Sequence, residues 1–253
     1  YYKKLFQTIG NIIELIEKDD IPKYLLFLEN AFPYMDNYNY HKGMNGIIQE
    51  LKCLLKTKNI GTDSDRALLL DFQAALETKP EKAIKLEKDA LAQIETITAD
   101  NARLVSNLHA NLGGLYRMNA HPDLAREHME KSISLLDQFN LLHINDSIPQ
   151  IANYAMFLTE QQEPERGISE LQKLSGIIKE YHSDDCLDYA KVQETLATIY
   201  LMTANLPQAK THFKRAFKIY EKIWADEPEM IEAKYQEIQE LYPQIGFSIG
   251  KTL

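Results

Sequence analysis

The chain is organised around the segment Asn107–Asp137, which reads NLHANLGGLYRMNAHPDLAREHMEKSISLLD. Its hydrophobic periodicity predicts a helix, a short turn that contains Pro122, and a second helix. Both helices carry large and small residues in an order that permits close antiparallel packing. This order is Leu112, Gly113 and Tyr116 on the first helix, then Ala125, Met129 and Ser132 on the second.

The same order of large and small residues returns with a period of 42 residues. A strong copy lies two periods later and consists of Leu196, Ala197, Tyr200, Ala209, Phe213 and Ala216. A weaker copy lies between them and consists of Tyr154, Ala155, Leu158, Gly167, Leu171 and Leu174. The sequence therefore predicts stacked repeats with a continuous core between neighbouring units.

Prolines test this register independently. Proline is favoured at the first position of a helix, where its missing N–H would have had no partner. Pro80, Pro122, Pro164 and Pro207 follow one another at 42, 42 and 43 residues. Each stands where the second helix of a repeat is predicted to begin.

The order of residues resembles the tetratricopeptide-repeat signature, in which W-x2-L-G-x2-Y is followed by A-x3-F. The period of 42 residues is similar to that of the kinesin-light-chain variety of this family. The resemblance covers Asp63 to Tyr242 and implies an all-α fold, a right-handed α-solenoid of antiparallel helix pairs. The first copy departs from the pattern, because Asp71 fills the glycine slot and Glu87 the aromatic slot. We expect that unit to pack less tightly.

These patterns divide the chain into three parts. Residues 63–242 are predicted to form four helix pairs plus a closing helix, residues 1–60 an N-terminal helical cap or divergent repeat, and residues 243–253 a tail. The helices of the array are expected at 64–77, 80–97, 102–119, 122–138, 148–161, 164–181, 186–204, 207–224 and 228–242. Buried positions should include Leu112, Tyr116, Ala125, Leu196, Tyr200, Ala209, Phe213 and Ala216.

Composition restricts the possible partners and the cellular setting. The net charge of −9 argues against nucleic acid, and no apolar run is long enough to cross a membrane. Cys53 and Cys186 lie in different units, which favours free thiols and the cytoplasm. A basic run on the predicted helix 207–224 is either a solvated outer face or a site for an acidic partner. The chain starts at Tyr1, so we expect it to be part of a longer protein, and its oligomeric state stays open.

Motifs for catalysis are missing from the sequence. It contains no phosphate-binding glycine loop, HExxH, CxxC pair or GxSxG. The run His182, Asp184, Asp185 and Cys186 falls in a predicted turn, where such residues cap helices more often than they bind metal. We therefore expect no enzymatic activity, no cofactor and no metal.

The resemblance implies that a second stripe on the first helix of each repeat lines a concave groove for peptides. The candidate groove residues are Phe72, Asn107, Asn111, Met118, Asn153, Met156, Lys191, Thr195 and Met202. Asn111 and Asn153 share a slot in which related repeats use asparagine to bond the backbone of an extended peptide. Alternatively, these asparagines bond a neighbouring helix. The methionines either pack in the ordinary way or give the groove an adaptable apolar surface.

The leading hypothesis is an interaction module that holds a peptide segment of a partner protein. Two alternatives stay open: a sensor or regulatory arm of a larger signalling ATPase or transcription regulator, and a peptide-pheromone receptor. A chaperone-type clamp for a terminal carboxylate is disfavoured, because Lys191 and Thr195 occupy the slots where that family places paired cations.

Overall fold

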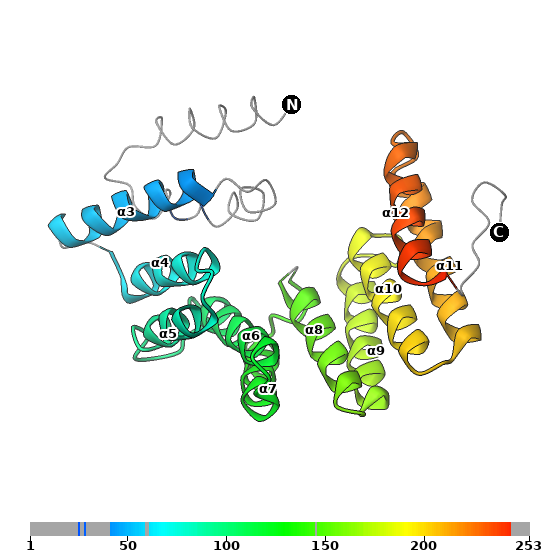
Figure 1. Cartoon of the computed structure of the whole chain (residues 1–253), viewed down its shortest axis with the longest axis horizontal. Helices are drawn as coiled ribbons and strands as arrows, with labels where there is room; N and C mark the ends of the chain where they lie inside the picture. The colour runs from blue at the N-terminus through cyan, green and yellow to red at the C-terminus, as the bar shows by residue number, and fades with distance from the viewer. Residues whose placement is uncertain (1–24, 26–27, 29–40, 59–60, 145, 244–253) are drawn as a thin grey trace. The chain divides into compact units, whose positions relative to one another are not determined.

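The computed structural model describes residues 25, 28, 41–58, 61–144 and 146–243. Over these residues the chain is entirely helical and has no strand (Figure 1). The first 40 residues of the predicted N-terminal cap or divergent repeat lie outside the described residues apart from Leu25 and Leu28, and so do residues 244–253 of the predicted tail. The chain divides into two compact units, residues 1–128 and residues 129–253.

The helices follow one another in consecutive pairs, as the repeat pattern predicts. They are α3 (His41–Lys58), α4 (Asp63–Ala75), α5 (Pro80–Leu91), α6 (Ala102–Met118), α7 (Pro122–Gln138), α8 (Ser147–Glu160), α9 (Pro164–Tyr181), α10 (Leu187–Met202), α11 (Leu206–Ile223) and α12 (Pro228–Leu241). Each helix predicted within 63–242 is present. The prediction for α5 was too long, because α5 ends at Leu91 and not at 97. Asn101 organises the loop that follows, since its side chain bonds both Thr98 N and Thr96 O.

The turns inside the helix pairs repeat with the same period as the prolines. Ala120, Gln162 and Ala204 have positive φ angles of 58°, 65° and 58° and lie 42 residues apart. In each turn the next residue donates its N–H to a carbonyl five residues earlier, as from His121 to Tyr116 O at 2.9 Å. This is the hydrogen bond of the Schellman motif, which usually places glycine in the left-handed position. The repeat therefore keeps the turn but uses residues that adopt it at a cost.

The start of α4 is fixed by a capping box. The Thr62 hydroxyl accepts from Asp65 N at 3.1 Å, and the Asp65 carboxylate accepts from Thr62 N at 2.6 Å. Thr62 suits this position because Asp65, three residues later, supplies the acidic side chain of the capping box.

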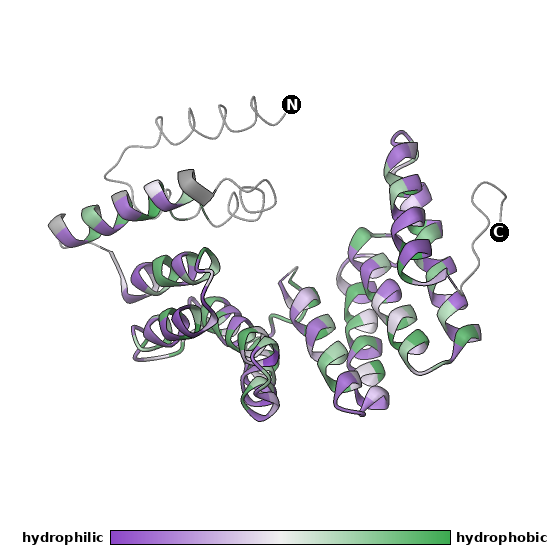
Figure 2. Cartoon of the chain, viewed as in Figure 1, coloured by the Kyte–Doolittle hydropathy of each residue, from purple (hydrophilic) through white to green (hydrophobic). Residues whose placement is uncertain are grey.

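The second unit has a continuous apolar core. Buried side chains of α8, α9, α10 and α11 form one cluster, to which Ile238 of α12 also belongs. Figure 2 shows hydrophobic and hydrophilic residues alternating around these helices, as expected for elements that are buried on one side. Gly167 allows α8 and α9 to approach closely, because a Cβ atom on it would lie 2.6 Å from Ala155 O.

The first unit is covered at its start by α3. Ile48, Leu51 and Leu55 of α3 share one cluster with Leu69 and Phe72 of α4. A second cluster joins Ala67, Ala90 and Leu108, one residue each from α4, α5 and α6. The inner side of α4 is therefore occupied by the helix that precedes it.

The predicted core positions are buried with one exception. Seven of the eight residues expected in the core have exposed fractions of 5% or less, but Tyr200 is half-buried. Its ring stacks on His212 at a centroid distance of 5.3 Å. The equivalent pair two periods earlier, Tyr116 and His128, is also stacked, at 5.5 Å. A tyrosine–histidine stack is thus part of the strong repeats, and in the later copy it leaves one side of the tyrosine open to solvent.

Candidate functional site

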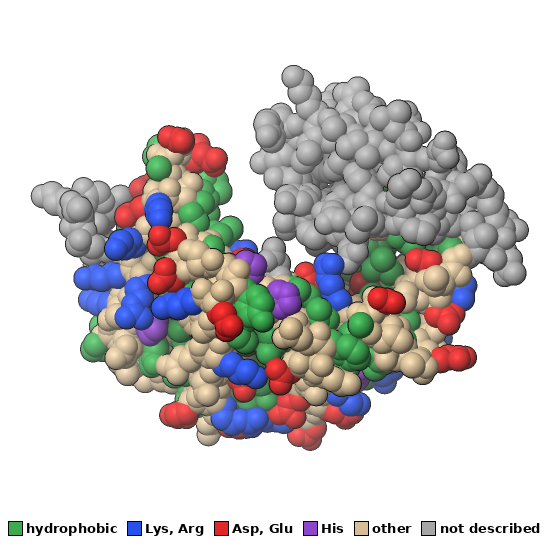
Figure 3. Space-filling model, turned by 180° about the vertical axis from the view of Figure 1, so that it is seen from behind, with side chains coloured by type: hydrophobic (Ala, Val, Ile, Leu, Met, Phe, Trp, Pro, Cys, Tyr) green, Lys and Arg blue, Asp and Glu red, His purple; other side chains and the backbone are tan. Residues whose placement is uncertain are grey.

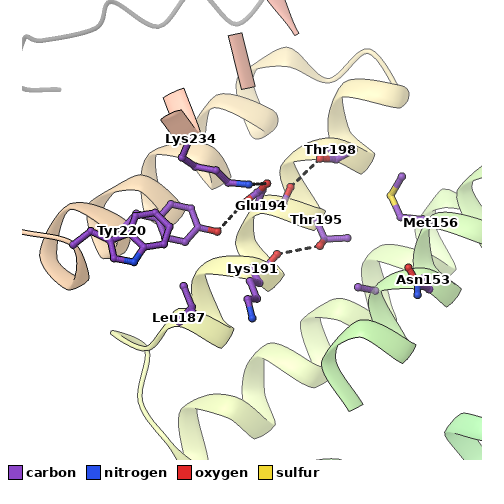
Figure 4. A pocket seen from close by; sticks show the side chains of 11 residues that line it. Asn153, Met156, Leu187, Lys191, Glu194, Thr195, Thr198, Tyr220 and Lys234 are labelled. Atoms are coloured by element: carbon purple, nitrogen blue, oxygen red, sulfur yellow. Dashed lines mark hydrogen bonds and ion pairs between the residues drawn. The ribbon is translucent and has the colours of Figure 1, made fainter. Parts of the chain in front are cut away.

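The second unit contains a cavity of about 490 Å³ on the side formed by the first helices of its repeats (Figure 4). α8, α10 and α12 contribute most of the lining, and the end of α11 contributes the rest. The lining residues are Ala152, Asn153, Met156, Leu187, Lys191, Glu194, Thr195, Thr198, Tyr220, Trp224 and Lys234.

One wall of the cavity is a closed polar network around Glu194. Tyr220 donates its hydroxyl to Glu194 Oε2 at 2.6 Å, and Lys234 Nζ lies 2.7 Å from Glu194 Oε1. Burial and then the Glu194 carboxylate raise the pKa of Tyr220 far above its ordinary value. Burial alone would lower the pKa of Lys234, but Glu194 and Glu237 raise it. These groups satisfy one another, so the network joins α10, α11 and α12 and fixes the shape of the cavity.

Two polar groups that line the cavity have no hydrogen-bond partner among the described residues. Asn153 of α8 is exposed, and its side-chain amide makes no hydrogen bond to any described residue. The indole N–H of Trp224 likewise has no partner among the described residues. The Trp224 ring is stacked on Tyr220 with centroids 4.7 Å apart and planes at 10°. The cavity thus combines a rigid aromatic surface with free hydrogen-bonding groups.

The remaining lining residues divide into apolar and weakly paired polar side chains. Met156 and Leu187 are half-buried and supply apolar surface. Lys191 is about half exposed, and its Nζ lies 3.6 Å from Asp188 Oδ1. Thr195 donates its hydroxyl to Lys191 O at 3.0 Å within the helix, so its oxygen can still accept. A ligand could therefore meet apolar, cationic and neutral polar groups within one hollow.

Four of the predicted site residues, Asn153, Met156, Lys191 and Thr195, meet in this cavity. Met202 lies further along α10, is 48% exposed and does not line it. The other four predicted site residues, Phe72, Asn107, Asn111 and Met118, belong to the first unit.

In the first unit the predicted site residues have different environments. Phe72 is only 4% exposed, because α3 packs against it, so its side chain is not presented at a groove wall. Met118 is 80% exposed at the end of α6. Asn107 is half-buried and has interaction partners. Asn111 is exposed, and its amide donates to Asp71 Oδ1 at 2.8 Å.

Asp71 forms an acid pair with the buried Glu87. Glu87 is 1% exposed, and burial, the charge of Asp71 and a hydrogen bond to Asp71 raise its pKa to about 10. Glu87 is therefore protonated at neutral pH and forms a hydrogen bond with the Asp71 carboxylate. Its Oε2 atom has no hydrogen-bond partner among the described residues. The asparagine amide of the first unit is thus engaged by a neighbouring helix, whereas that of Asn153 is not.

The sequence analysis did not identify Leu187, Tyr220, Trp224 and Lys234 as site residues. Tyr220 and Trp224 are four residues apart at the end of a second helix, where the repeat pattern places no groove residues. A useful signal was available, since Trp224 is the one tryptophan of the chain. A tryptophan at the end of an amphipathic helix often contributes to a binding surface.

Among the described residues no group of three or more His, Cys, Asp or Glu side chains could hold a metal ion. Cys186 instead caps α10, because its sulfur accepts from Tyr189 N at 3.5 Å. Within the same residues no helix has the length and apolar character needed to cross a membrane.

Comparison with known proteins finds a family model that matches part of the second unit. Residues 147–222 match the family model described as tetratricopeptide repeat. A search of curated proteins finds no match.

Solved structures with the same fold include a putative kinesin light chain from Podosopora anserina with nearly identical TPR-like repeats. That protein is 13% identical, with a TM-score of 0.59, and the match covers 78% of this chain and 96% of that chain. BtubC (BKLC) from P. vanneervenii is 14% identical, with a TM-score of 0.54 and coverage of 92% and 96%. At these identities the likeness is one of fold.

Proposed function

We propose that this chain, a tetratricopeptide-repeat protein in which residues 147–222 match the family, holds an extended peptide segment of a partner in the cavity of its second unit. The repeats themselves indicate a protein-interaction scaffold. The observation that carries the more specific proposal is that Asn153, whose amide makes no hydrogen bond to any described residue, lines the same cavity as the Trp224 ring.

A peptide backbone offers a donor and an acceptor at almost every residue, and an asparagine amide can pair with both at once. Such a pairing reads the extended shape of the peptide and not its sequence. Met156, Leu187 and Trp224 then provide an apolar place for one peptide side chain. The volume of about 490 Å³ is within the range of small-ligand cavities and suits one or two side chains of an extended segment.

Selection from a random peptide library tests this proposal. The wild-type chain should enrich extended peptides that share an apolar or aromatic anchor. Met156→Ala should weaken the enriched peptides by roughly 1–2 kcal/mol, because apolar surface against the anchor is lost. Met230→Ala is the matched control, since Met230 is an exposed methionine of α12 that does not line the cavity.

Two outcomes would contradict the proposal: no peptide is enriched, or both methionine variants weaken binding equally. As a setting we propose the cytoplasm, which agrees with the observation that Cys53 and Cys186 form no disulfide in the part of the chain that the structure describes.

A further inference from the structure

α11 carries an unusual concentration of positive charge for a chain with a net charge of −9. Five cations follow its outer side, and we call them the α11 basic stripe: Lys210, Lys214, Arg215, Lys218 and Lys222. At about 100° per residue they cover an arc of roughly 140°. Buried Phe213 and the cavity residue Tyr220 lie outside this arc, so the stripe is separate from the cavity. Figure 3 shows Lys and Arg side chains gathered on one part of the surface.

The repeat itself does not require these charges. One period earlier the equivalent positions of α9 are Ile168, Gln172, Lys173, Gly176 and Glu180, and their charges cancel. Two periods earlier the positions in α7 are Arg126, Glu130, Lys131, Ser134 and Gln138, with a single net positive charge. The stripe is therefore a property of α11 and not of the fold.

Four of the five cations form no ion pair within the described part of the chain. They are Lys210, Lys214, Arg215 and Lys218. Lys222 pairs with Asp185 of the loop before α10. Lys222, and to a lesser degree Lys218, lower the pKa of Asp185. The α11 basic stripe therefore stabilises the charged form of a carboxylate that approaches it. The remaining cations are placed to do the same for carboxylates of another molecule.

The spacing of the stripe selects the shape of its partner. Lys210, Lys214, Lys218 and Lys222 follow one another at four residues, which is about 6 Å along the helix axis. Alternate side chains of an extended peptide are separated by about 6.6 Å on one face. An extended segment with Asp or Glu at every second position can thus place successive carboxylates opposite successive lysines.

Other polyanions fit less well. A membrane surface would favour apolar side chains between the cations, but the residues within the arc include the polar Thr211 and Glu221. Nucleic acid would bring a long array of phosphates near a chain that is otherwise strongly acidic. We propose that the α11 basic stripe is a docking surface for an extended acidic protein segment with carboxylates at alternate positions.

The test measures binding of a fluorescent peptide of alternating Glu and Ser to three forms of the chain. Lys214→Glu combined with Lys218→Glu should weaken binding at least about tenfold, because two attractions become repulsions. The control is Lys82→Glu combined with Lys85→Glu on α5. These lysines are also exposed and form no ion pair with described residues, and the change in net charge is equal. The control should bind within about twofold of wild type, and thermal unfolding should verify that all three forms are folded.

Further binding measurements distinguish the possible partners of the α11 basic stripe. Wild-type binding should weaken as salt is raised, and a peptide of the same composition with its glutamates in one block should bind less tightly than the alternating one. Equal affinity of the wild type and the stripe variant would overturn the proposal. It would also be overturned if duplex DNA or phosphatidylserine vesicles bound the stripe more tightly than the peptide. Self-association of the wild type that disappears in the stripe variant, without peptide binding, would assign the stripe to a contact between copies and reject the proposal.

Discussion

The first and third helix pairs place opposite chemistry in equivalent positions. In the first pair, the half-buried Asp71 and the buried Glu87 form an acid pair, and Glu87 is 1% exposed. Two periods later the same positions are Ala155 and Leu171, both completely buried. One fold thus tolerates a protonated carboxyl where it elsewhere requires close apolar contact. The repeat therefore determines where a side chain lies. The residues that contact this side chain determine its protonation and its hydrogen bonds.

Asn111 and Asn153 also occupy equivalent repeat positions and have different environments. They lie one period apart, and Asn111 bonds Asp71. The Asn153 amide makes no hydrogen bond to any described residue. Equivalent asparagines of two repeats therefore differ in whether their amides are already engaged within the chain.

The largest expected effect comes from replacing the acid pair with the residues of the third helix pair. Asp71→Ala combined with Glu87→Leu should stabilise the chain by roughly 1–4 kcal/mol, because the desolvated Glu87 carboxyl and the carboxylate that contacts it are removed. Urea unfolding measures the change. A loss of stability would mean that the acid pair stabilises the first unit more than apolar packing could.

The next prediction concerns the close contact between α8 and α9 at Gly167. Gly167→Ala should destabilise by roughly 1–3 kcal/mol, since the new Cβ would meet Ala155 O at 2.6 Å. Gly176→Ala in the same helix is the control, because nothing lies within 4 Å of its Cβ. This control should stabilise by about 0.5–1 kcal/mol through helix propensity. Similar effects of both changes on thermal unfolding would argue against the close approach of α8 and α9.

The two units should respond to pH in opposite directions. The pKa of Glu87 is raised from 4.5 to about 10 in the folded chain, so the folded state holds a proton that the unfolded state loses. Stability should therefore fall as pH rises from about 5 towards 10. The pKa of His212 is lowered to about 4 by burial and by Arg215, so stability should fall as pH drops below about 6.5.

Denaturant titrations across pH, with Glu87→Gln and His212→Gln, separate these contributions. Glu87→Gln should reduce the loss of stability at alkaline pH only, and His212→Gln should reduce the loss of stability at acidic pH only. If Glu87→Gln leaves the alkaline side unchanged, Glu87 is ionised in the folded chain and the description of the acid pair is incorrect.

The smallest expected effect concerns a feature that both units share. Ala120→Gly and Ala204→Gly should each stabilise by about 0.5–1 kcal/mol, because glycine adopts positive φ without strain. The two effects should be equal, since the turns have the same geometry. Unequal shifts in the melting temperature would mean that the turns differ in more than their φ angles.

Much of the fold could be predicted because proline and residue size repeat along the sequence. Pro80, Pro122 and Pro164 mark helix starts correctly. The left-handed residues at 120, 162 and 204 could not be predicted, because alanine and glutamine carry no signal for that conformation. The sequence showed that Asp71 and Glu87 depart from the repeat pattern. It did not predict that the two carboxyl groups form a hydrogen bond with each other.

The candidate site was less accessible to sequence reasoning. Period and helical spacing were enough to predict Asn153 and Met156 on one face of α8, and both line the cavity. Trp224 and Lys234 enter the cavity from α11 and α12, and their approach depends on how successive helices stack. That stacking is a property of packing between helices, which a periodic pattern on each helix does not specify.

The most direct test of the account compares Asn153→Ala with Asn111→Ala in one experiment that measures peptide affinity and stability. Asn153→Ala should weaken diverse selected peptides by similar factors of about 2 to 12, equivalent to 0.5–1.5 kcal/mol, and leave the melting temperature unchanged. Asn111→Ala should leave peptide affinity unchanged and lower stability, because Asp71 loses a hydrogen bond. Equal loss of affinity in both variants, or full affinity in Asn153→Ala, would contradict the assignment of binding to the cavity of the second unit.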